Sequence, residues 1–127
     1  MKFLFTMVAL VIALLAVDAY GQVVEATDQN LLQLAQKARA EGKKGILLEF
    51  HAEWCGYCKQ TEPMVAAAAV RIPEIIVLKI DADKNPQAAK DVSGLPTLIM
   101  ISNKGVRERQ GLPKGQSELA EWIKGGL

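Results

Sequence analysis

The chain has 127 residues, half of them hydrophobic, and a formal net charge of +1. This length fits one domain with a core of its own and leaves little room for a second domain. Charges of both signs are scattered along the chain, and no basic stripe is available to bind phosphates, which argues against a nucleic-acid-binding protein. The sequence therefore predicts one domain without a nucleic-acid partner.

The N-terminal segment has the pattern of a secretory signal peptide. Met1 and Lys2 precede an apolar run of fifteen residues from Phe3 to Val17, and small residues follow at the positions that cleavage requires. We expect a signal peptide over 1–21, cleaved near 19–21, and export of the domain 22–127 to the periplasm or another external compartment. An uncleaved membrane anchor is the alternative, although a spanning helix needs about 20 residues.

Helix and strand patterns alternate after this segment. Leucines and alanines spaced by three and four predict a helix that begins near Leu31 and ends at Gly42. The apolar runs 46–51 and 74–80 predict two buried strands. Between them, an alanine-rich helix is predicted over 59–70, and this alternation favours a parallel strand pair.

The second half of the chain has a different pattern. A helix is expected to begin at Pro86, which suits the first helical position. The segments 97–101 and 106–110 predict an antiparallel hairpin, because turn-forming residues lie between them. Helical spacing after Ser117 predicts a last helix. The fold class is therefore α/β, with a central mixed sheet flanked by helices.

Cys55 and Cys58 are the only cysteines, and His51 is the only histidine. This set excludes a scaffold of several disulfides and a four-ligand structural zinc site. Neither a metal nor a bound cofactor is expected, and the cysteine pair itself is the candidate functional group.

The two cysteines fall where a predicted strand passes into a predicted helix. At a helix N-terminus, unpaired amide N–H groups and the helix dipole favour a thiolate, so the pKa of Cys55 should fall from about 8.5 toward 7 or below. Cys58 lies one turn further in and should be more buried, which suits it to resolve a mixed disulfide formed by Cys55.

A static structural disulfide, or half of a metal site shared with a partner chain, is the alternative for this pair. A ring closed by so few residues gains little from loop closure. The position at a strand-to-helix junction is also the one that redox chemistry requires, so we favour a redox-active pair.

The chain resembles the thioredoxin family in several separate motifs. The active-site resemblance lies in Phe50, Ala52 to Gly56, Cys58, Lys59 and Pro63. Further matches follow in the same order as in that family, at Lys79, Asp83 to Pro86, Gly94 to Thr97, and Gly111. The resemblance covers the chain from about Gln22 to the C-terminus and implies a thioredoxin fold.

The resemblance also implies roles for individual residues. Pro96 matches a cis-proline that faces the disulfide and leaves backbone groups free for an extended substrate, with Leu95 beside it. Glu49 matches a buried aspartate that takes the proton of the resolving cysteine, and burial should raise its pKa. Lys79 could pair with Glu49 and moderate that rise. The alternative for Glu49 is an acid at the edge that reaches solvent.

Other residues of the motif are assigned to contact surface. Trp54, Gly56 and Tyr57 are expected to contact substrates together with Leu95 and Pro96, and Trp54 also shields the site. The Gly-Tyr pair between the cysteines resembles some exported isomerases and reductases. His51 is interpreted as a half-buried packing or surface residue, with electrostatic tuning of Cys55 as the alternative.

These features predict an exported thiol–disulfide oxidoreductase that reduces or exchanges disulfides of protein substrates through Cys55 and Cys58. A monomer is expected, and a membrane disulfide reductase would supply electrons, because the external compartment is oxidising. A disulfide isomerase or oxidant is the alternative within the same chemistry. A thioredoxin-like binding module without turnover is the alternative from another class.

Overall fold

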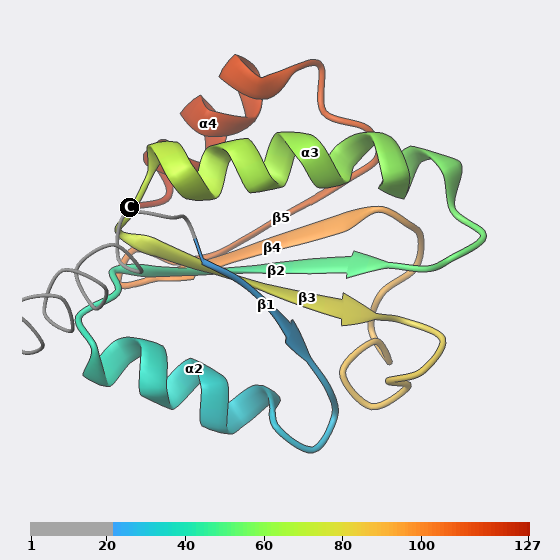
Figure 1. Cartoon of the computed structure of the whole chain (residues 1–127), viewed down its shortest axis with the longest axis horizontal. Coiled ribbons are helices and arrows are strands. Elements are labelled where there is room, and N and C mark those ends of the chain that lie inside the picture. Colours follow the sequence, from blue (N-terminus) through green and yellow to red (C-terminus); the bar gives the residue numbers. More distant parts are fainter. Residues whose placement is uncertain (1–21) are drawn as a thin grey trace, which may run out of the picture.

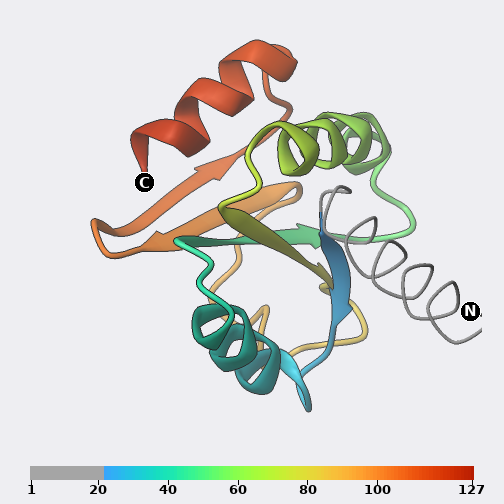
Figure 2. The ribbon, with the colours of Figure 1, turned by 60° about the vertical axis from the view of Figure 1, so that its left-hand side comes forward.

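A computed structural model describes residues 22–127, and the expected signal peptide with its cleavage site lies outside the described residues. The domain is a five-stranded mixed sheet with the strand order β1-β3-β2-β4-β5. Helices α3 and α4 cover one face and α2 covers the other (Figures 1 and 2). The elements are β1 (Val23–Ala26), α2 (Leu31–Ala40), β2 (Gly45–His51), α3 (Gly56–Arg71), β3 (Ile75–Asp81), β4 (Thr97–Ser102), β5 (Gly105–Gln110) and α4 (Gln116–Gly125).

The two predicted apolar strands form the centre of the sheet. β2 and β3 pair in parallel, with Leu47 opposite Val77, and β4 pairs with β2 in the antiparallel direction. Both central strands are buried on their two faces, which explains their nearly continuous apolar sequence. The predicted fold class, a mixed sheet flanked by helices, is confirmed.

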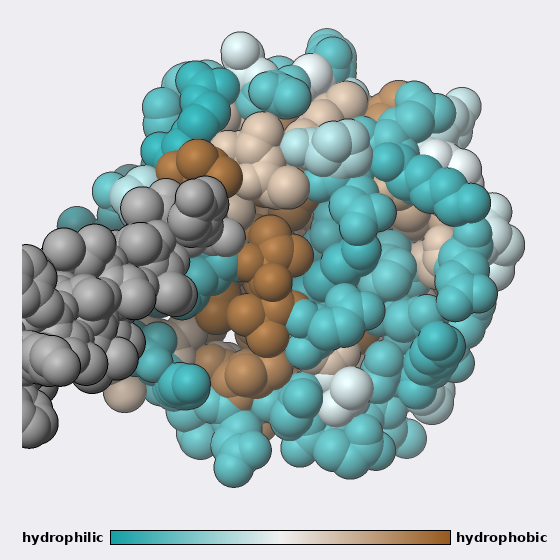
Figure 3. All heavy atoms as spheres, in the orientation of Figure 1, coloured by the Kyte–Doolittle hydropathy of each residue, from teal (hydrophilic) through white to brown (hydrophobic). Residues whose placement is uncertain are grey.

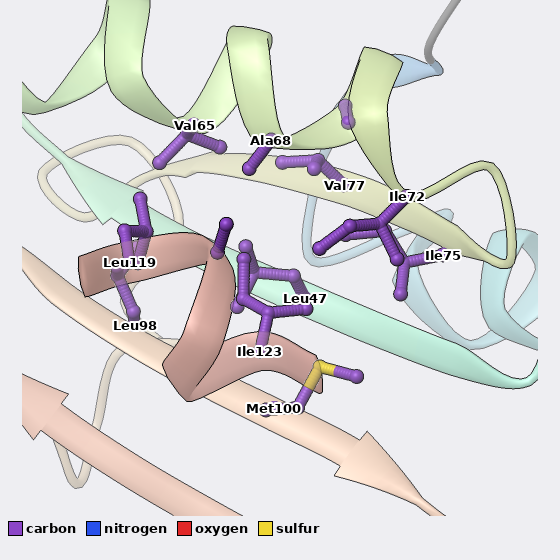
Figure 4. Close-up of a cluster of buried hydrophobic side chains, with 12 residues drawn as sticks. Leu47, Val65, Ala68, Ile72, Ile75, Val77, Leu98, Met100, Leu119 and Ile123 are labelled. Atoms are coloured by element: carbon purple, nitrogen blue, oxygen red, sulfur yellow. The ribbon is translucent and has the colours of Figure 1, made fainter. Parts of the chain in front are cut away.

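The hydrophobic core is divided by the sheet into two layers. Figure 4 shows the layer between the sheet and helices α3 and α4, where Leu47, Val77 and Leu98 meet Val65 and Ile123. A second layer lies between the sheet and α2 and contains Ile46, Phe50, Leu78 and Ile80. Successive residues of a strand point to opposite faces, so odd-numbered positions of β2 point toward α3.

β1 was not predicted from the sequence. It has only four residues and pairs in parallel with the edge of β3, where Val23 lies opposite Val77. Such a short segment carries too few side chains to show an alternating pattern. Figure 3 shows a group of hydrophobic residues in this part of the surface, between polar regions.

The helix expected at Pro86 does not form; residues 86–91 are a series of turns. The Asp28 carboxylate accepts hydrogen bonds from the backbone N–H groups of Gln87 and Ala88, at 3.2 and 2.8 Å. The Asn85 side chain accepts from the Asp28 N–H at 2.9 Å. Contacts with a residue nearly sixty positions earlier thus stabilise a turn conformation, and a local pattern could not indicate them.

The predicted hairpin and last helix are confirmed. β4 and β5 are antiparallel, and their turn contains Gly105 with a φ of +115°, a conformation that favours glycine. α4 begins at Gln116, one residue before Ser117, where the helical spacing begins in the sequence. Among residues 22–127, no helix has the length and apolar character needed to cross a bilayer.

Candidate active site

The cysteine pair lies at the N-terminal end of α3, where β2 ends (Figure 1). Cys55 is the N-cap residue of this helix, and Cys58 lies in its first turn. The two residues are joined by a disulfide, with their Cα atoms 5.2 Å apart. The backbone N–H of Cys58 donates to Cys55 Sγ at 3.1 Å. The structure therefore places the Cys55 sulfur at the unpaired amide groups of a helix start.

The expectation that Cys58 is the more buried cysteine is wrong for the disulfide form. Each cysteine is 5% exposed. Both pack in one cluster with Ala52 and Leu95, so the loop before β4 covers Cys55 as well. A position one turn further into a helix does not decide burial when another loop lies against the helix end.

Two aromatic side chains next to the cysteines face solvent. Trp54 is 70% exposed and Tyr57 is 60% exposed. The indole N–H of Trp54 donates to Asp83 Oδ2 at 2.8 Å. This bond holds the indole ring by one edge. The rest of the ring can therefore contact another molecule while the side chain keeps its position.

The Leu95–Pro96 peptide bond is cis, as the resemblance implied. Leu95 packs against the cysteine cluster, and the Pro96 C=O accepts from the Gly111 N–H at 2.9 Å. In the described part of the chain, the Leu95 N–H and C=O have no hydrogen-bond partner. This backbone can therefore pair with an extended segment of another protein.

A cavity of about 270 Å³ lies between Trp54, the residue before Cys55, and the loop that carries Leu95. Its walls are largely small or apolar and include Ala82, Ala89 and Val92.

Glu49 is buried in β2, with 3% of its surface exposed, so the alternative of an acid that reaches solvent is excluded. Its Oε2 has no hydrogen-bond partner among residues 22–127. Burial raises the pKa of Glu49 from 4.5 to about 7. The charge of Lys79 opposes this rise, whereas those of Glu62 and Glu25 add to it.

Lys79 lies opposite Glu49 in the register of β2 and β3, but it does not form the predicted ion pair. Its ammonium group donates to Glu62 Oε1 on α3 instead. Burial acts to lower the pKa of Lys79, but the hydrogen bond and negative charge of Glu62, together with the charges of Glu49 and Glu25, outweigh it and raise the pKa above 10.5. Glu62 is exposed in α3, so the sequence pattern gave no reason to include it in the site.

A second cavity, of about 210 Å³, lies next to Cys58. Cys58, Glu62, Lys79 and His51 are among the residues that line it. His51 is half-buried, as predicted, and its Nε2 lies 3.9 Å from Glu25 Oε1. The structure thus brings the resolving cysteine, the lysine and an unpredicted carboxylate to one cavity. Residues 22–127 contain no group of three acidic, histidine or cysteine side chains that could hold a metal ion.

A sheet with helices on both faces and a disulfide at the start of a helix define a thiol–disulfide oxidoreductase of the thioredoxin class. The thioredoxin family model matches residues 22–125. The chain belongs to the thioredoxin family.

Similar proteins include thioredoxins and isomerases. A thioredoxin from Chlamydia trachomatis is 41% identical over 80 residues, which are 61% of this chain and 78% of that protein. A protein disulfide-isomerase from Datisca glomerata is 43% identical over 67 residues, 49% of this chain but only 13% of the isomerase. The solved thioredoxin of Fasciola hepatica is 32% identical with a TM-score of 0.69, covering 84% of this chain and all of that one.

Proposed function

We propose that the protein is an exported reductase or exchange protein for disulfides of other proteins. The observation that carries this proposal is the position of Cys55 Sγ at the start of α3, where it accepts the Cys58 N–H at 3.1 Å. In the reduced form, the same amide groups and the helix dipole favour a thiolate on Cys55. Cys55 is then the attacking sulfur.

The proposed reaction has two exchange steps. The Cys55 thiolate attacks one sulfur of a target disulfide, a mixed disulfide forms, and the other target sulfur leaves with the electron pair. Cys58 then loses its proton and attacks Cys55 Sγ, which forms the Cys55–Cys58 disulfide and releases the second target sulfur as a thiolate. The target gains two electrons, and the protein is oxidised by two.

We assign Glu49 as the acceptor of the Cys58 proton. It is buried in β2 and points to the face that α3 covers, and its pKa of about 7 makes it a base near neutral pH. The Lys79 ammonium group bonds to Glu62 rather than to Glu49, so it acts on Glu49 through its charge.

Target proteins would bind across the exposed rim of the disulfide. Trp54 and Tyr57 offer apolar surface, Gly56 leaves the helix start open, and the backbone of Leu95 pairs with an extended segment of the target beside Pro96. A cavity next to Trp54 would accept an apolar target side chain. No bound cofactor takes part in either exchange step.

Export is supported by the signal-peptide pattern of residues 1–21. An external compartment is oxidising, so continued reduction requires electrons from the inside, and we infer a membrane disulfide reductase as their donor. The protein would act as a monomer. The similarity to protein disulfide-isomerases favours isomerisation as the second candidate.

A trapping experiment tests this role. In bacterial cells that produce the full chain with Cys58→Ser, Cys55 should accumulate mixed disulfides, because no sulfur can resolve them. We expect the partners to be exported proteins with disulfides and one membrane protein. Partners drawn only from the cytosol would contradict export. The Cys55→Ser/Cys58→Ser double variant is the control and should trap nothing.

A further inference from the structure

Lys79, the lysine that lies opposite Glu49, forms its ion pair with another carboxylate. Lys79 lies opposite Glu49 on β2 and opposite Glu25 on β1. Its Nζ nevertheless donates to Glu62, which lies on α3 and is half exposed. Among the described residues, Glu49 Oε2 therefore has no hydrogen-bond donor.

Glu62 lies where it can determine which carboxylate Lys79 bonds to. It follows Cys58 by four residues in α3, and residues four apart lie on the same helix face. Glu62, Lys79 and Cys58 line the same cavity of about 210 Å³. The Glu62 carboxylate therefore competes with Glu49 for the Lys79 ammonium group. This competition takes place next to Cys58, whose thiol must lose its proton.

Glu49 is surrounded by charged and titratable side chains from several elements. Lys79 faces it from β3, Glu25 from β1 and Glu62 from α3, while His51 lies two positions further along β2. On the β4 side the neighbour is the apolar Leu98. Lys79 is the only lysine or arginine in this set, so its position determines how strongly the Glu49 carboxylate is stabilised.

We propose that Glu62 is a positioning residue that holds Lys79 away from Glu49, which keeps Glu49 able to take the Cys58 proton near neutral pH. This inference rests on the proposed role of Glu49. In the described part of the chain, Glu62 makes no hydrogen bond to either sulfur, so it acts through Lys79. In the resolution step the proton passes from Cys58 Sγ to Glu49, and the released target thiolate takes a proton from solvent.

Two substitutions should act in opposite directions. Glu62→Gln removes a negative charge and frees Lys79 to pair with Glu49, so the pKa of Glu49 should fall by about one pH unit. Lys79→Gln removes the only cation, so the pKa of Glu49 should rise. Carbon-13 NMR titration of the glutamate carboxyl groups measures both shifts, and Glu49→Gln identifies the signal. The pH at which the rate of insulin reduction reaches half its maximum should move in the same directions.

The matched control is Glu121→Gln on α4, which removes an exposed carboxylate paired with Lys124 at 3.8 Å and should leave both titrations unchanged. The proposal is overturned if the two variants move the Glu49 titration in the same direction, or if neither moves it. If the titrations shift as expected but Glu49→Gln reduces insulin at the normal rate, the positioning by Glu62 holds and the proton-acceptor role of Glu49 fails.

Discussion

Replacement of Cys55 by serine should lower insulin reduction to the uncatalysed rate. A serine hydroxyl does not ionise near neutral pH, so no nucleophile remains at the start of α3. Cys58 lies inside the first turn of the helix, and the amide N–H groups of the helix start point to position 55 rather than to its own sulfur, so it should not take over the attack. The rate at which insulin precipitates in the presence of dithiothreitol measures this loss.

The control is Cys58→Ser, which removes the other sulfur but leaves the attacking one. This variant should still form a mixed disulfide with insulin, which mass spectrometry of the intact protein detects, although it should not turn over. If Cys55→Ser retained turnover, or if only Cys55→Ser formed the mixed disulfide, the assignment of the two sulfurs would be reversed.

The stability of the domain should depend on pH through Glu49. Its pKa is about 7 in the folded protein, against an ordinary value of 4.5. Folding therefore favours the protonated form, and the contribution of this group is fully present below pH 4.5 and is lost as pH rises through 7. The two pKa values correspond to a loss of about 3 kcal/mol.

Glu49→Gln should remove this dependence, because glutamine has nearly the same shape and no charge. Urea unfolding at pH 4 and pH 8 should give similar stabilities for variant and wild type at the lower pH. At the higher pH the variant should be more stable by about 3 kcal/mol. The exposed Glu121→Gln on α4 is the control and should follow the wild type. An equal difference between Glu49→Gln and wild type at both pH values would contradict the raised pKa of Glu49.

Much of this fold could be predicted because the patterns that indicate its strands and helices lie within short, continuous segments of the sequence. The buried runs that became β2 and β3 are continuous in sequence, and the two-residue spacing of Cys55 and Cys58 follows directly after β2. β1 has only four residues, so its identity as a strand depends on pairing with β3. The turns after Pro86 depend on Asp28, which no local pattern reveals.

The ion pair of the site also depends on contacts between distant segments, which a local sequence pattern does not indicate. The sequence placed Lys79 and Glu49 on neighbouring strands, and the register confirms that they lie opposite one another. It could not show which carboxylate the flexible lysine would bond, because that depends on how α3 lies over the sheet. Glu62 reaches the same cavity from that helix, and its exposed position concealed its part in the site.

The direction of electron flow is tested most directly by the reduction potential of the Cys55–Cys58 disulfide. For this two-electron pair, about 30 mV changes the balance by 1.4 kcal/mol. The potential can be measured by equilibrating the protein with glutathione buffers and counting free thiols by mass. We expect a value near that of thioredoxin, about −270 mV, and a value near −180 or −120 mV, typical of isomerases and oxidants, would contradict a reducing role.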